Sequence, residues 1–122
     1  MNVADIFSAA PCVAAVGIEP DEVVDGRCVS RLEPAERRPQ HDGVVHAGGL
    51  AAMADHAAGA VSARMLTPGG IVLTTEFRIS LLRAARGERH RCRAEVIKPG
   101  SRVTFAESTL MCETDGREGR VA

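Results

Sequence analysis

An acidic side chain interrupts an apolar stretch of the sequence, and it is the first candidate for chemistry. Residues 45 to about 65 are mostly Ala, Val, Leu, Met and Gly, but Asp55 carries a carboxylate. An ionised carboxylate in apolar surroundings costs free energy unless it is paired or hydrogen-bonded. We therefore interpret Asp55 as a general base or nucleophile in a cleft. The alternative is a carboxylate that caps a loop or faces solvent at a helix edge.

The residues just before this stretch can stabilise negative charge on an oxygen atom. A loop that leads into a helix directs backbone N–H groups and the positive end of the helix dipole toward one point. A carbonyl oxygen that becomes an oxyanion is stabilised there, and Ala47 and Gly48 would supply the amides. The side-chain amide of Gln40 can donate to the same oxygen or to a water molecule. Asp55 lies about two and a half turns further along a helix, so it reaches that oxygen less easily within its own subunit.

The apolar stretch itself predicts a helix. Because it is apolar nearly all round, we expect this helix to be surrounded by protein. Residues 67–70, Thr-Pro-Gly-Gly, then end it. Before the helix, residues 33–43 have the composition of a loop, and residues 2–10 predict a short helix that Pro11 ends.

Alternating apolar and polar residues predict strands on both sides of the helix. Residues 22–32 predict one or two strands that meet at a turn or bulge around Gly26. After the helix, residues 71–81 alternate with a period of two, which predicts a long strand with one buried face. Cys92, Ala94 and Val96 repeat the pattern, and residues 114–116 predict a turn before a short last strand. Residues 102–112 predict another strand, with these side chains on one side: Val103, Phe105, Thr109 and Met111.

The order of elements predicts an α+β fold in which an antiparallel sheet wraps around one long apolar helix. The chain has 122 residues, of which 45% are hydrophobic. This size and composition are typical of one packed domain, so we expect a single domain over residues 1–122.

Composition argues against several other classes of protein. A net charge of -1 and an aromatic content of 2% do not favour nucleic acid as a partner. The first ten residues do not resemble a secretory signal, and no apolar run is long enough for a membrane span, so we expect a cytoplasmic protein. Four cysteines lie far apart without CxxC spacing, which predicts reduced, buried thiols and no metal. His41 and His90 are expected to be solvated.

The residues around Asp55 resemble the signature of the hotdog-fold thioesterases of the phenylacetate-pathway (PaaI) type. In that family an Asn or Gln and a Gly precede His-Gly-Gly, and an Asp or Glu follows nine positions after the His. Gln40, Gly43, His46 and Asp55 stand in this register. Residues 81–88 also resemble the end of a strand in that family, so the likeness extends over most of the chain.

The resemblance implies a hotdog fold and an acyl-CoA thioesterase that requires no metal or cofactor. Similar enzymes are homodimers or homotetramers with active sites at the dimer interface, where Gln40, His46 and Ala47 of one chain face Asp55 of the other. Ala47 replaces the first Gly of His-Gly-Gly and keeps its N–H group. His46 would fix the loop by hydrogen bonds. The hydroxyl that matches by position is that of Thr74, which would orient the hydrolytic water.

Coenzyme A carries phosphates, which Arg side chains contact well because the guanidinium can bind in a bidentate manner. Arg83, Arg86 and Arg102 are the candidates, and each is also consistent with a solvated charge at a strand end. Two other functions remain open. One is a hotdog hydratase or dehydratase, although no additional catalytic His is in place for it. The other is a non-catalytic acyl-CoA binding module, which would be favoured if Ala47 disturbs the oxyanion hole. The sequence does not indicate the acyl group.

Overall fold

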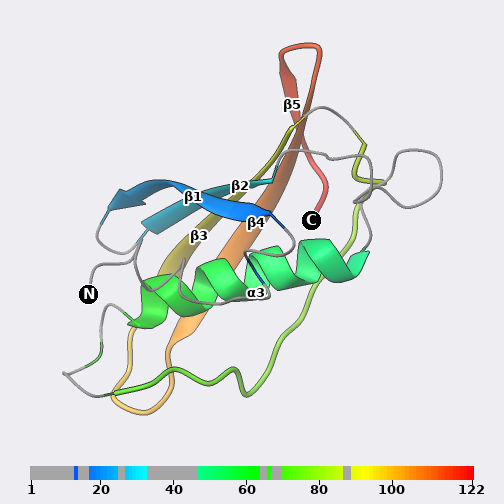
Figure 1. Cartoon of the computed structure of the whole chain (residues 1–122). Coiled ribbons are helices and arrows are strands. Elements are labelled where there is room, and N and C mark those ends of the chain that lie inside the picture. The colour runs from blue at the N-terminus through cyan, green and yellow to red at the C-terminus, as the bar shows by residue number, and fades with distance from the viewer. Residues whose placement is uncertain are drawn as a thin grey trace.

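In the computed structural model, the described residues form five strands and one long helix (Figure 1). The structure describes residues 13, 17–24, 27–32, 47–63, 66, 70–86 and 89–122. In chain order the elements are β1 (Ile18–Val24), β2 (Arg27–Leu32), α3 (Ala47–Ala63), β3 (Arg89–Lys98), β4 (Phe105–Thr114) and β5 (Arg117–Arg120). The predicted α+β class is confirmed. The short helix expected over residues 2–10 and the loop expected over 33–43 lie outside the described residues.

The strands form one antiparallel sheet in the order β1-β2-β3-β4-β5. Each strand therefore pairs with its neighbour in the sequence. Of the one or two strands expected within residues 22–32, the structure has two, although β1 begins earlier, at Ile18. The long pairing of β3 with β4 runs from Arg89 opposite Glu113 to Lys98 opposite Phe105. The short last strand is confirmed as β5, which has four residues.

Helix α3 packs against one face of this sheet, as Figure 1 shows. Leu50, Met53, Ala57 and Val61 are buried and recur every three or four residues, so they form one stripe along the helix. This stripe shares a buried cluster with side chains from the sheet: Cys28, Leu32, Cys92, Ala94 and Leu110. Burying a large apolar side chain contributes roughly 1.5–3 kcal/mol, so this interface contributes much of the core's stability.

The large apolar side chains of residues 103–111 do not all lie on the inward face of β4. Val103 and Phe105, expected on one side with Thr109 and Met111, are 54% and 58% exposed. The buried side chains of β4 are Leu110 and Cys112, and the small Ala106 and Ser108 on the same face are half-buried. Small residues stand there because α3 approaches β4 closely: the Ser108 hydroxyl donates to the Ala54 carbonyl oxygen at 2.7 Å.

The prediction of a strand over residues 71–81 is wrong. These residues have no regular secondary structure, and residues 71–78 are exposed. In Figure 1 the segment from residue 70 to residue 86, coloured green to yellow, passes alongside α3 toward β3. Near its end, the Leu82 N–H donates to the Val121 carbonyl oxygen at 2.8 Å. Alternation decides which side chains share a face, but a strand also needs a neighbouring backbone to pair with, and no described strand lies beside residues 71–81.

His90, expected in solvent, is buried in β3 at 1% exposed, so that expectation is also wrong. Its side chain lies on the inward face of the strand, with Nε2 3.7 Å from Cys112 Sγ. Burial lowers the pKa of His90, which favours the neutral imidazole.

Three of the four cysteines are described, and the prediction of reduced, buried thiols is confirmed for them. Cys28, Cys92 and Cys112 are free and buried. Burial raises the pKa of Cys28 to about 11 and that of Cys92 to about 12, so both thiols stay protonated near neutral pH. In the described part of the chain, no helix has the length and apolar character needed to cross a membrane.

The predicted turn between β4 and β5 is confirmed, and its backbone supplies a test of the fold. Asp115 and Gly116 have φ values of 51° and 75°. Both values lie in the left-handed region, which residues other than Gly, Asn and Asp rarely adopt. We expect Gly116→Ala to lower the free energy of unfolding by roughly 1–2 kcal/mol in urea denaturation. Gly116→Asn is the matched control and should lose less. Equal stability of the two variants would contradict this description of the turn.

Candidate active site

Asp55 lies in the middle of α3 and is half-buried, between the buried Ala54 and the buried Ala57. The hydroxyl of Thr74 donates a hydrogen bond to Asp55 Oδ1 at 2.8 Å. Thr74 belongs to the exposed segment that passes alongside the helix. The hydrogen bond offsets part of the cost of placing a carboxylate at the edge of an apolar core, and it holds one carboxylate oxygen while the other can contact a ligand.

Asp55 and Thr74 both line a cavity of about 200 Å³. Its walls come from α3, from the segment that carries Thr74 and from the loop between β3 and β4, which contributes Arg102. Asp55, Thr74 and Arg102, singled out separately in the sequence, therefore meet at one place. The cavity is smaller than the usual 300–1,000 Å³ of ligand pockets, so a single chain encloses only part of a ligand as large as an acyl-CoA. The lining residues are Asp55, Ala58, Gly59, Ser62, Leu66, 71–75, 100–104 and Ala106.

Two hydrogen bonds hold the elements that form this cavity. The bond from the Ser108 hydroxyl to the Ala54 carbonyl oxygen joins β4 to the helix one residue before Asp55. In the β3–β4 loop, the Gly100 N–H donates to Thr104 Oγ1 at 3.4 Å. The position of Asp55 is thus set by the sheet, and the loop wall is set by a short turn. A sequence signal for the turn exists at residues 98–100, Lys-Pro-Gly, but nothing in the spacing shows that this loop reaches α3.

Helix α3 lies within the stretch from residue 45 to about 65 in which the sequence predicts a helix. The helix begins at Ala47, and both Ala47 and Gly48 are exposed. Because a helix rises about 1.5 Å per residue, the amide of Ala47 and the carboxylate of Asp55 are separated by roughly 12 Å along the axis. One small reacting group cannot touch both within one chain. Gln40 and His46, the other candidates near this helix end, lie outside the described residues.

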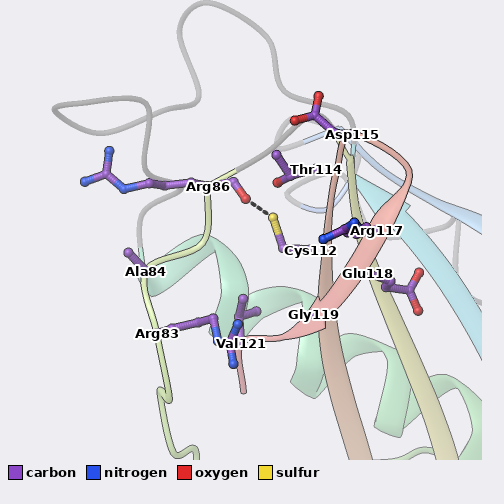
Figure 2. Close-up of a pocket in the computed structure, with 10 residues that line it drawn as sticks. All are labelled: Arg83, Ala84, Arg86, Cys112, Thr114, Asp115, Arg117, Glu118, Gly119 and Val121. Atoms are coloured by element: carbon purple, nitrogen blue, oxygen red, sulfur yellow. Dashed lines mark hydrogen bonds between the residues drawn. The ribbon is translucent and has the colours of Figure 1, made fainter.

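Arg83 and Arg86 do not lie beside Asp55. They line a second cavity of about 660 Å³, formed with β4, the β4–β5 turn and β5 (Figure 2). The two cavities have no lining residue in common. Arg117, which was not among the candidates from the sequence, also lines the second cavity. The sequence shows that Arg117 directly follows a predicted turn, but it does not show which residues of other segments lie near Arg117 in the fold.

Among the described residues, no three His, Cys, Asp or Glu side chains are grouped so that they could hold a metal ion. The chemistry that the described residues themselves offer is that of a carboxylate fixed by a hydroxyl, with a guanidinium on the same cavity. Such a group can accept a proton from water or attack an electrophilic carbon.

Comparisons with known proteins place the chain in a family. The sequence model of a family described as the thioesterase superfamily matches residues 42–118. Among solved structures, a thioesterase family protein from Silicibacter pomeroyi is 34% identical, with 98% of this chain and 88% of that chain covered and a TM-score of 0.92. A conserved protein from Pseudomonas aeruginosa is 25% identical, with 94% and 89% covered and a TM-score of 0.81.

A third similar structure bears on the fold alone. A protein from Ralstonia eutropha JMP134, described as related to phenylacetic acid degradation, is 21% identical, with 99% of this chain and 93% of that chain covered and a TM-score of 0.77. No protein with a curated description matches the chain. The family model and the Silicibacter pomeroyi structure confirm the resemblance to thioesterases that the residues around Asp55 predict, and the similar structures confirm the hotdog fold.

Proposed function

The chain belongs to the thioesterase superfamily, and on that premise we propose that it hydrolyses acyl-CoA thioesters to a free acid and CoA. At the level of the family, the reaction is thioester hydrolysis. The observation that supports the finer proposal is the hydrogen bond between Thr74 and Asp55 on the wall of the cavity beside α3. Arg102 on the same cavity would contact a phosphate of CoA.

In the proposed reaction, Asp55 acts as general base or nucleophile. Thr74 donates a hydrogen bond to Oδ1, and Oδ2 would face the substrate or a water molecule. As a base, Asp55 takes a proton from a water whose oxygen attacks the thioester carbon. As a nucleophile, Asp55 attacks that carbon itself, and water cleaves the resulting acyl-enzyme. In both cases the C–S bond breaks and CoA leaves as a thiolate.

The proposed oxyanion hole comes from a second copy of the chain. The amides of Ala47 and Gly48, with the side-chain amide of Gln40, would donate to the oxyanion. His46 would fix the loop that carries them. Because roughly 12 Å along the helix separates Ala47 from Asp55 in one chain, a partner subunit is needed to bring the two halves of the site together.

An exposed apolar surface supports this dimer. Several large apolar side chains of the segment that carries Thr74 face solvent in the single chain: Ile71 at 76%, Leu73 at 76%, Phe77 at 43%, Leu81 at 50% and Leu82 at 60%. Contiguous apolar surface on a protein marks a site of contact with another molecule. A second copy that covers it would complete the site in a symmetric dimer, which can associate further into a tetramer. We also propose a cytoplasmic location, because the buried free thiols fit a reducing compartment.

The central prediction concerns Asp55. Release of free thiol should be measured with short, medium and aryl acyl-CoAs for the native chain and for Asp55→Asn. We expect kcat to fall by about 10² or more in the variant, as is typical when a positioned acid–base group is lost. Asp21→Asn, which changes an exposed carboxylate on β1, is the matched control and should keep its activity. Unchanged turnover in Asp55→Asn would refute the proposal, and acyl-CoA binding without turnover by the native chain would favour a binding module.

Thr74 should act through its hydroxyl group. Thr74→Val keeps the shape of the side chain but removes the hydrogen bond to Asp55, and a bond to a charged group contributes about 1.5–3 kcal/mol. We expect kcat to fall about tenfold or more, with a smaller change in KM. Thr74→Ser retains the hydroxyl and should stay close to the native value. If valine and serine variants have equal kcat values, Thr74 does not orient Asp55.

The exposed apolar segment should be the dimer interface. Leu73→Glu places a charge on that surface and should shift the protein toward monomer in light scattering, with a parallel loss of thiol release. Ile97→Glu is the matched control: Ile97 is 60% exposed, but it belongs to β3 and not to the segment that carries Thr74. We expect that variant to remain a dimer. A native monomer with full activity would exclude a site shared between subunits.

A further inference from the structure

The tip of the β3–β4 hairpin, residues 97–105, carries large apolar side chains that no described part of the chain covers. Ile97 is 60% exposed, Val103 is 54% exposed and Phe105 is 58% exposed. Every residue from 97 to 103 is exposed. Figure 1 shows this connection, coloured yellow to orange, at the end of the hairpin opposite the β4–β5 turn. Apolar side chains that gather on an exposed surface mark a site of contact with another molecule.

The strand register brings Ile97 and Phe105 together. Lys98 lies opposite Phe105 and Val96 lies opposite Ala106, so Ile97 is the additional residue of a bulge between these two pairs. A bulge sets two residues of one strand against one of its neighbour and redirects a side chain. Two large apolar side chains therefore stand next to each other where the hairpin leaves the sheet.

The turn that links the two strands is held in one conformation. The Gly100 N–H donates to Thr104 Oγ1 at 3.4 Å. A Cβ atom at Gly100 would collide with the carbonyl oxygen of Val103, so the backbone passes itself closely there. The tip is thus formed before it meets a partner, and binding does not have to order it.

The charges at the tip are all positive. Lys98 and Arg102 are the only charged residues between Glu95 and Glu107, and both are exposed. Within the described part of the chain, neither of these two cations forms an ion pair. Anionic lipid headgroups attract basic residues that stand beside an apolar surface. The combination of exposed apolar side chains and unpaired cations therefore complements an anionic lipid surface.

The nearest acidic residues of the hairpin lie far enough back to stay in water. Glu95 and Glu107 are directly opposite each other and exposed. Each is two residues from Ile97 or Phe105, which is roughly 7 Å along a strand. Protein segments that lie in a lipid interface enter it by about 5–10 Å. A tip that enters as far as Ile97 and Phe105 keeps both carboxylates outside the lipid.

The small size of the tip favours lipid over a protein partner. A stable interface between proteins takes roughly 20–30 residues from each side, whereas residues 97–105 are nine residues. A lipid interface sets no such requirement, because a few apolar side chains enter it and the cations contact its headgroups.

We propose that the tip of the β3–β4 hairpin docks on an anionic lipid surface. Ile97 and Phe105 enter the interface, and Lys98 contacts the phosphates of the headgroups. Residues 100–104 also line the cavity that contains Asp55, so docking brings this cavity close to the lipid. Such a peripheral contact needs no membrane-spanning helix. It does not rest on the thioesterase proposal, because Asp55 and Thr74 have no part in it.

Co-sedimentation with vesicles tests the docking directly. We expect the native protein to bind vesicles of phosphatidylglycerol and phosphatidylcholine, and Ile97→Glu and Phe105→Glu each to weaken binding about tenfold or more. Lys98→Gln should weaken it about fivefold, because a basic residue near an anionic surface contributes about 1 kcal/mol. Arg93→Gln removes an exposed cation of β3 away from the tip, and this matched control should bind like the native protein.

Three results would overturn the proposal. The first is no binding to the anionic vesicles, the second is equal binding by Ile97→Glu and Arg93→Gln, and the third is equal binding of the native protein to vesicles of phosphatidylcholine alone. Light scattering separates lipid from a second copy of the chain as the occupant. Ile97→Glu should keep the native state of association, and a smaller assembly would assign the tip to a contact between copies and also overturn the proposal.

The failure of docking and the failure of the proposed reaction give different results. Asp55→Asn should lose thiol release but bind the anionic vesicles like the native protein. Ile97→Glu should lose vesicle binding but retain hydrolysis of a short acyl-CoA in the absence of lipid. Thermal unfolding of each variant verifies that it is folded.

Discussion

The packing of α3 against only one side of the sheet is the constraint on which the rest of the structure depends. Leu50, Met53, Ala57 and Val61 are buried because they face β2, β3 and β4. Small side chains on the facing strands let the helix come close, and the hydrogen bond from Ser108 to the Ala54 carbonyl oxygen anchors it. No described strand covers the opposite side of the same helix. This side carries Asp55, and it leaves a cavity where a ligand can enter.

That one-sided packing is also the basis of the proposed dimer. The segment of residues 70–86 passes alongside α3 with several of its large apolar side chains in solvent, which is unfavourable for an isolated protein. Thr74 nevertheless has a defined partner, because its hydroxyl is bonded to Asp55. In the proposed dimer, the surface that each chain leaves exposed is covered by the other, and the helix N-terminus of one copy meets the Asp55 of its partner. Stability and catalysis would then depend on the same contact.

Much of this fold could be predicted from the sequence, because local patterns determine it. An apolar stretch gave the helix, alternation at Cys92 and Ala94 gave β3, and Asp115-Gly116 gave the turn. The prediction failed where the answer depends on distant partners. Alternation over residues 71–81 does not supply the neighbouring strand that pairing needs, and the polarity of His90 does not show that β3 turns it inward.

The candidate site, like the fold, could be predicted from the sequence only in part. The spacing of a known signature identifies Asp55 and Thr74, and the structure brings the two within hydrogen-bonding distance. Their roles remain predictions, as do those of Gln40 and His46. The separation of Arg102 from Arg83 and Arg86 into two cavities could not be predicted, because it depends on how loops far apart in the sequence meet.

The most direct test of the central claim, that one active site is built from two copies, is subunit complementation. Asp55→Asn and Gln40→Ala chains, each expected to be nearly inactive alone, are unfolded together, refolded and assayed for thiol release. Our account predicts recovery of roughly a quarter of native activity, because about half of the dimers are mixed and each of these holds one intact site. No recovery, with mixed dimers verified by mass spectrometry, would contradict it.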